Sequence, residues 1–178
     1  YYFYIDLEGH VEDPRVRKAA VAKLMDPQAL AGVVRDDTDD GVRAQAILML
    51  RDIALEAFEE VGEADSATAI DAISEPRTLA HIAKTATRET SAARALGRLT
   101  DVNALGSIAR HAALEPIRMR AFASVCEQGA HDEVLAVAMN SDFKDTALPA
   151  IGQVTDRGER DQINSRGRNK SAGKRARS

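Results

Sequence analysis

The sequence predicts an all-α protein, a right-handed α-solenoid of about six short helical hairpins. Three observations support this fold class. Aromatic residues make up only 4% of the 178 residues and Trp is absent, although 44% are hydrophobic, a mixture that favours closely packed short helices over a barrel or sandwich. A pattern of apolar residues at helical spacing recurs six times along the chain. In each copy of the pattern, an acidic residue lies two positions after an apolar residue.

Each copy of the pattern places an Ala before an apolar anchor and an acid two positions after it. The anchors are Leu24, Leu50, Ile73, Leu99, Val125 and Val154. Their separations are 26, 23, 26, 26 and 29 residues. Because one hairpin cannot bury its apolar face alone, the copies must stack on one another.

The acids have a simple role in this scheme, at the point where one helix ends and the next begins. We predict that Asp26, Asp52, Asp101 and Asp156 are N-caps, whose carboxylates accept hydrogen bonds from otherwise unpaired helix amides. Pro27 follows Asp26 at the first helical position, where a missing N–H does no harm. A ladder of metal sites would instead need ligands that converge, and these acids are spread one per repeat. We therefore predict neither a metal nor a cofactor.

The stretches DPRVRKAAVAKLMDPQAL and DDGVRAQAILMLRD, with an acid and a Val-Arg pair before an apolar helix, resemble the units of HEAT-like repeat proteins. The resemblance implies a curved surface for protein partners, occasionally for nucleic acid, and in some branches an enzyme. Arg17, Arg43 and Arg118 occupy the typical arginine position, but Ser66 and Ala92 replace it in the third and fourth copies. A ladder of arginines joining every repeat to the next is thus incomplete.

The enzymatic branches can be tested against residues of this chain. Iron-dependent hydroxylases with this fold carry His-Glu pairs, and no His here is followed by Glu. Repeat-type DNA glycosylases use Trp, which is absent. Bilin lyases are not excluded by motif. We interpret His81 and His111, on predicted second helices, as surface histidines, and predict a non-enzymatic protein without catalytic residues.

The carboxyl end is strongly basic. Candidate nucleic-acid contacts are Arg166, Arg168, Lys170, Lys174, Arg175 and Arg177. The chain from Arg157 onward carries a net charge of +6, which leaves −10 for the rest. RDQINSRGRNKSAGKRARS resembles the place where HEAT-like arrays end in a family of bacterial proteins of unknown function, in which a basic helix follows. Two interpretations stay open: the start of a further helical region, which we favour, or a weak nucleic-acid tail that an acidic body would oppose.

The amino end resembles a different family. YYFYIDLEGHVEDPRV is similar to the final strand and turn of the regulatory ACT domain in prephenate dehydratases. One strand cannot form a sheet, so the resemblance implies no enzyme here. The apolar YYFYI run needs burial, either on the first repeat or against sequence outside this chain. We divide the chain into an N-terminal extension (residues 1–11), a repeat array (12–165) and a basic C-terminal segment (166–178).

Location and function follow from these patterns. No apolar run reaches the roughly 18 residues that cross a bilayer, and no signal peptide is present, so we expect a soluble, cytoplasmic protein. We interpret Cys126 as a small core residue. The chain begins with Tyr and we expect it to be a fragment of a longer protein.

The predicted function is an interaction scaffold for a protein partner; the alternatives are a nucleic-acid-associated protein and a lyase-type or regulatory enzyme subunit.

Overall fold

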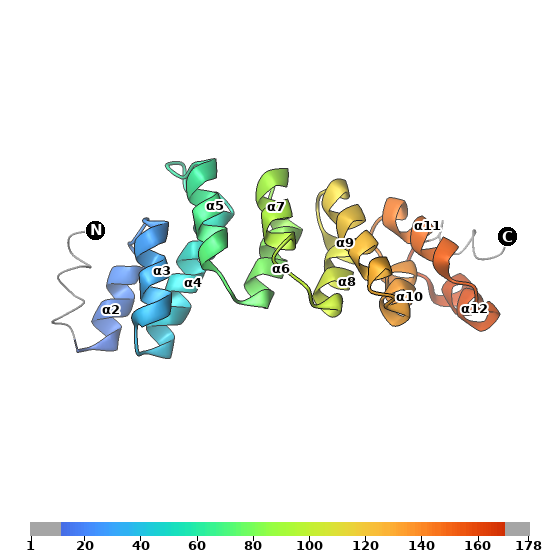
Figure 1. The fold of residues 1–178 in the computed structure, drawn as a ribbon, viewed down its shortest axis with the longest axis horizontal. Coiled ribbons are helices and arrows are strands. Elements are labelled where there is room, and N and C mark those ends of the chain that lie inside the picture. Colours follow the sequence, from blue (N-terminus) through green and yellow to red (C-terminus); the bar gives the residue numbers. More distant parts are fainter. Residues whose placement is uncertain (1–11, 170–178) are drawn as a thin grey trace. The chain divides into compact units, whose positions relative to one another are not determined.

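The structure, a computed structural model, describes residues 12–169, which contain eleven α-helices and no strand (Figure 1). The all-α fold class is therefore confirmed for this part of the chain. No helix in the described range is long and apolar enough to cross a membrane. The extension at residues 1–11 lies outside the described residues. The chain divides into two compact units, Tyr1–Thr78 and Leu79–Ser178.

The first unit is built around the longest of its helices. Its helices are α2 (Pro14–Val21), α3 (Pro27–Asp36), α4 (Asp40–Ala54) and α5 (Glu63–Ala72), and α6 (Pro76–Thr85) begins at its end. Helix α4 packs against α2, α3 and α5, because its apolar residues recur every three or four positions. Leu30, Leu50 and Ile53 are fully buried between these helices.

The second copy of the pattern has no second helix. Asp52 lies inside α4, which continues to Ala54, so the prediction that Asp52 is an N-cap is wrong. Ile53 and Ala54 prolong the buried stripe of α4, whereas Pro27 starts a new helix directly after Asp26. Residues 55–62 then form turns before α5 begins.

An unusual backbone conformation ends α4. Glu56 has a positive φ of 54°, which is uncommon for a residue with a side chain. The Ala57 amide donates to the Asp52 carbonyl and the Glu56 amide donates to the Ile53 carbonyl, both at 3.0 Å. This pair of bonds is the Schellman pattern of helix ends, here with Glu where Gly is usual.

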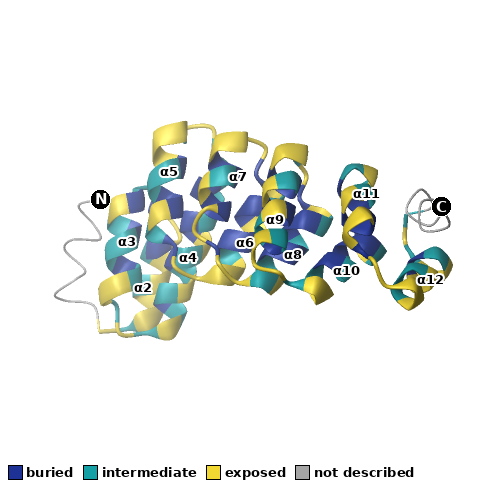
Figure 2. Cartoon of the chain, turned by 45° about the vertical axis from the view of Figure 1, so that its right-hand side comes forward, coloured by how far each residue is buried: buried dark blue, intermediate teal, exposed yellow. Residues whose placement is uncertain are grey.

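The second unit contains two rows of helices. Its helices are α7 (Glu89–Leu96), α8 (Val102–His111), α9 (Glu115–Glu127), α10 (His131–Asn140), α11 (Lys144–Gln153) and α12 (Arg157–Arg166). First helices α7, α9 and α11 pack in one row, and second helices α8, α10 and α12 pack in another. Figure 2 marks the buried residues of these helices in dark blue and the exposed helix ends and turns in yellow.

The buried residues follow the repeat pattern. All six anchors are buried, as the spacing predicts. In the second unit they are joined by apolar side chains of both helix rows, Leu105, Ile108, Ile117 and Ile163. The core therefore lies between the rows, and the exposed sides of the helices carry the polar residues.

Candidate interaction surface

Three of the four predicted capping acids lie at helix N-termini. Asp26 accepts a hydrogen bond from the Gln28 amide at 2.9 Å and begins α3. Asp101 and Asp156 each accept from the amide three residues later, at 2.8 and 2.9 Å, and begin α8 and α12. These carboxylates are used by the fold itself and are one repeat or more apart.

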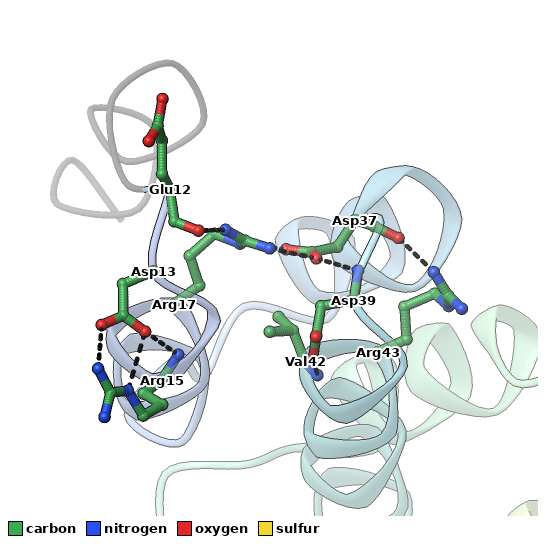
Figure 3. A network of polar contacts seen from close by, with 8 residues as sticks. All are labelled: Glu12, Asp13, Arg15, Arg17, Asp37, Asp39, Val42 and Arg43. Atoms are coloured by element: carbon green, nitrogen blue, oxygen red, sulfur yellow. Dashed lines mark hydrogen bonds and ion pairs between the residues drawn. The ribbon is translucent and has the colours of Figure 1, made fainter.

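The arginines of the first helices are enclosed as well. In the first unit, Arg17 makes a bidentate pair with Asp37, with N–O distances of 2.9 and 3.1 Å (Figure 3). The same carboxylate accepts the Asp39 amide at 2.9 Å, and Asp39 in turn accepts the Val42 amide at the start of α4. Arg43 donates to the Asp37 carbonyl at 2.6 Å. The network joins α2 to the turn between α3 and α4.

Two opposing effects set the charge state of Asp37. Burial by itself raises the pKa of its carboxyl. Hydrogen bonds from Arg17 and from the Asp39 amide, with the positive charges of Arg17 and Arg43, outweigh burial and bring the pKa of Asp37 below its ordinary value. Asp37 is therefore ionised in the folded protein over the neutral range.

Arg118 has the same role in the second unit. Its side chain is only 5% exposed and pairs with Asp145 at 2.5 Å. The guanidinium also donates to the carbonyls of Ala112 and Ala113 at 2.8 and 3.0 Å, and it lies 3.6 Å from the centroid of the Phe143 ring. Burial raises the pKa of Asp145, but the hydrogen bonds from Arg118 and Thr146 outweigh it and the pKa falls below its ordinary value.

The first-helix arginines therefore join neighbouring repeats through their contacts with Asp37 and Asp145. In the third and fourth copies, where Ser66 and Ala92 replace the arginine, the position is occupied in a different way. Ser66 is buried and donates to the Ala54 carbonyl at 2.8 Å, and Ala92 is buried by the surrounding helices.

The second helices carry a different set of links, which we call the polar seam. It consists of Lys84, Ser107, Arg110, Glu133, His131 and Glu159 on α6, α8, α10 and α12. Lys84 donates to Ser107 at 3.3 Å, Arg110 pairs with Glu133 at 2.7 Å, and His131 pairs with Glu159 at 2.9 Å. Each link joins one second helix to the next.

A junction around Asp142 lies beside the seam. His111 Nδ1 is 2.7 Å from one carboxylate oxygen of Asp142, and Arg168 is 2.9 Å from the other. The Asp142 amide donates to the Arg110 carbonyl at 3.1 Å, and the Arg168 amide donates to the Met139 carbonyl at 2.8 Å. The chain after α12 is thereby tied to the end of α10.

The seam also depends on a glycine. A Cβ atom at Gly106 would lie 1.9 Å from Glu133 Oε2, so the bare backbone of α8 leaves room for that carboxylate beside Arg110. The other pair, His131 with Glu159, is more open. Its hydrogen bond and the negative charge of Glu159 raise the pKa of His131 above the ordinary 6.5.

These groups form pairs that link successive second helices. Within residues 12–169, no three His, Cys, Asp or Glu side chains converge so as to hold a metal ion. Burial, with the nearby charge of Glu127, raises the pKa of the Cys126 thiol, which makes it a poor nucleophile at neutral pH. What the arrangement offers is a fixed pattern of paired charges along the second helices, mostly buried at Arg110 and Glu133 and more exposed at His131.

The predicted nucleic-acid contacts are only partly within the described residues. Arg166 is exposed in the last turn of α12, and Arg168 pairs with Asp142. Lys170, Lys174, Arg175 and Arg177 lie outside the described residues.

The negative charge is concentrated in one unit. Residues 12–78 carry 15 acidic and eight basic side chains, a net charge of −7, whereas residues 79–169 carry 11 acidic and 12 basic ones, a net charge of +1. The acidic body that the sequence predicts is thus acidic in its first unit only.

Sequence reasoning missed the seam and the Asp142 junction. A signal for them exists, because Lys84 and Ser107, like Arg110 and Glu133, are 23 residues apart, and His131 and Glu159 are 28 apart. A search for complementary polar residues one repeat apart would have returned these pairs among other candidates, such as Arg110 with Asp132.

No family model, curated protein or solved structure matches the chain.

Proposed function

We propose that the chain is a non-enzymatic interaction scaffold that binds a protein partner through the polar seam. The observation that carries this proposal is the pattern of charges held at fixed positions along α8, α10 and α12. Arg110, Glu133, His131 and Glu159 each keep a partner within the fold, so little side-chain freedom is lost when a partner contacts them. Complementary charges placed in this way confer specificity and guide encounter.

The proposed partner is a protein with mixed charge and hydrogen-bonding side chains. Both signs alternate along the seam, whereas a phosphate backbone would require mainly positive charge. The proposal includes a cytoplasmic location and the stacking of the hairpins into a right-handed, HEAT-like solenoid, since neighbouring repeats in each unit pack through equivalent faces.

Site-specific photo-crosslinking tests the proposal. A photoreactive residue at Asp132, exposed on α10 beside the seam, should crosslink to a discrete protein in cells. The matched position is Ala123, exposed on the first helix α9, where no crosslink is expected. Crosslinking in a cell lysate should persist when salt is raised before irradiation, because a protein interface combines apolar and polar contacts. Equal crosslinking from both positions, or none from Asp132, would contradict the proposal.

Nucleic-acid association is the second candidate, and the charge distribution favours keeping it. Residues 79–169 carry a net charge of +1, and four more Lys and Arg follow in residues 170–178, so the acidic first unit is the main source of repulsion. Removal of residues 170–178 tests this function while the Arg168–Asp142 pair is preserved. We expect binding to RNA or DNA to be weak at low salt and undetectable near physiological salt; tight, tail-dependent binding there would favour this candidate instead.

A further inference from the structure

The two halves of α12 are held on the fold in different ways. Ile163, in the second half, is fully buried and anchors the helix in the core of the second unit. In the first half, residues 157–162, every residue is exposed or half-buried. Gly158 lies in this half, and a glycine inside a helix weakens it. The first half of α12 therefore depends on polar links for its position.

One such link joins the first half of α12 to the start of α10. Both carboxylate oxygens of Glu159 lie 2.9 Å from Nε2 of His131, the first residue of α10. The Glu159 side chain is 24% exposed and the His131 side chain is 53% exposed. Water therefore reaches the imidazole, which can gain or lose a proton while the helices stay folded.

Carboxylates determine the charge of the His131 ring. The hydrogen bond with Glu159, followed by the charges of Glu159, Asp132 and Asp156, raises the pKa of His131 above 6.5. Helices α8, α9 and α11 also pack against α10, and their charged groups take part in other pairs, Arg110–Glu133 and Arg118–Asp145. The His131–Glu159 ion pair is therefore present below the folded pKa and is lost as pH rises through it.

The chain after α12 has a link of a different kind. Arg168 pairs with Asp142 at 2.9 Å, and the Arg168 amide donates to the Met139 carbonyl at 2.8 Å. His111 contacts the other oxygen of Asp142. An arginine keeps its charge at any pH at which the protein is folded. Loss of the charge on His131 therefore weakens the first half of α12, while Ile163 and Arg168 keep the second half in place.

We propose that His131 and Glu159 form a pH-sensitive latch for the first half of α12. With His131 protonated, the ion pair holds residues 157–162 against α10. With His131 neutral, this half opens more often, and Glu159 adds an unpaired negative charge to the polar seam. The latch is a property of the chain itself and operates whether or not a partner binds the seam.

Hydrogen exchange of the full chain tests the latch, with rates corrected for the intrinsic pH dependence of amide exchange. Measurements at about pH 6 and about pH 8.5 bracket the titration of a histidine whose pKa is raised. We expect protection of the amides of residues 160–162 to fall about threefold at the higher pH, because an exposed ion pair is a weak interaction. Protection of the α8 amides should stay the same.

Three variants assign the effect to the latch. Glu159→Gln should give low protection of residues 160–162 at both pH values, because it removes the charge that His131 pairs with. His131→Arg should give high protection at both, since arginine stays charged. The control is His111→Gln, at the imidazole beside Asp142, which should leave the pH dependence unchanged.

Each other result overturns the proposal. Equal protection of residues 160–162 at both pH values in the unmodified chain shows that no latch exists, and this comparison needs no variant that might fail to fold. An equal loss of protection in α8 means that the whole unit loosens. A pH dependence that persists in His131→Arg, or that disappears in His111→Gln, means that a different group responds to pH.

Discussion

Two arginines on one helix show that the surroundings of a charged side chain determine how much it contributes to stability. Arg118 and Arg120 both lie in α9, two positions apart. The Arg118 side chain is 5% exposed and contacts Asp145, whereas the Arg120 side chain is 60% exposed and its nearest carboxylate, on Glu89, is 3.7 Å away. A buried charge that loses its partner is costly, and a solvated pair contributes little.

We therefore expect opposite sensitivities at these positions. Arg118→Ala should reduce the free energy of unfolding by about 3 kcal/mol, because it leaves the Asp145 carboxylate without its guanidinium. Arg120→Ala should reduce it by less than about 0.5 kcal/mol. Chemical denaturation of both variants gives the comparison, and similar losses would contradict the structural role of Arg118.

The pair of His131 with Glu159 predicts a pH dependence. The folded pKa of His131 is raised above 6.5, so its contribution to stability is fully present below that pH and is lost as pH rises through the folded pKa. NMR titration of the His131 ring should show the raised pKa, and Glu159→Gln should return it towards the ordinary value. A Glu159→Gln variant with an unaltered His131 titration would show that the pair does not form in solution.

At the scale of single helices, most of the signals in the sequence lie at the helix ends. Asp26 followed by Pro27 predicts the start of α3, because both residues favour the first turn. Asp52 has the same place in the repeat pattern, yet the residues after it continue the buried stripe of α4. The turn at Glu56 has no sequence signal, since Gly or Asn usually takes the left-handed position.

Mutation distinguishes the acids that cap helices from Asp52, which lies inside a helix. Asp26→Ala and Asp101→Ala should each destabilise the protein by about 0.5–2 kcal/mol, since each removes an N-cap. Asp52→Ala, inside α4, should cost less than either cap, because Ala favours the interior of a helix. Thermal melting of the three variants is sufficient. A larger loss for Asp52→Ala would restore the sequence-based assignment.

Replacing either of two glycines by Ala tests the backbone geometry of the helices. We expect the two changes to alter stability in opposite directions. Gly129 ends α9 with a φ of 65°, so Gly129→Ala should destabilise by about 1 kcal/mol although no atom lies within 4 Å of the added Cβ. Gly152 lies inside α11 with open space around it, and Gly152→Ala should stabilise by about 0.5–1 kcal/mol. The sign of each change in unfolding free energy is the result to compare.

At the scale of the whole molecule, the repeat pattern determines which segments can be exchanged. The apolar anchors could be predicted from the sequence because burial follows periodicity. The seam could not, because an acidic residue one repeat away from Arg110 is identified as its partner only when the helices are placed. Glu133 and Asp132 are adjacent in the sequence, and only Glu133 pairs with Arg110.

Removal of one whole repeat should therefore preserve folding. Deletion of residues 89–114 removes α7 and α8 and puts Arg88 in place of Leu114, and both residues are extended N-caps. Ser107 and Glu133 are one deletion length apart, so Lys84 would then face Glu133. We expect a cooperative helical melt at a lower temperature, measured by circular dichroism.

The control removes half of that repeat. Deletion of residues 89–101 removes α7 alone and would place a second helix in the row of first helices, so we expect the cooperative transition to be lost. Loss of helical signal after the whole-repeat deletion, with a normal melt after the half-repeat deletion, would contradict the assignment of repeat boundaries.

The side-chain links between successive repeats have a consequence for synthesis on the ribosome. The sequence separation is 20 residues between Arg17 and Asp37, 27 between Arg118 and Asp145, and 31 between His111 and Asp142. Each link can therefore close as soon as the next repeat has emerged, without waiting for the carboxyl end. Short sequence separations of this kind favour rapid folding and allow a growing chain to fold from its amino end. We expect a stalled chain that ends after α4 to resist protease already, while the rest is still to be translated.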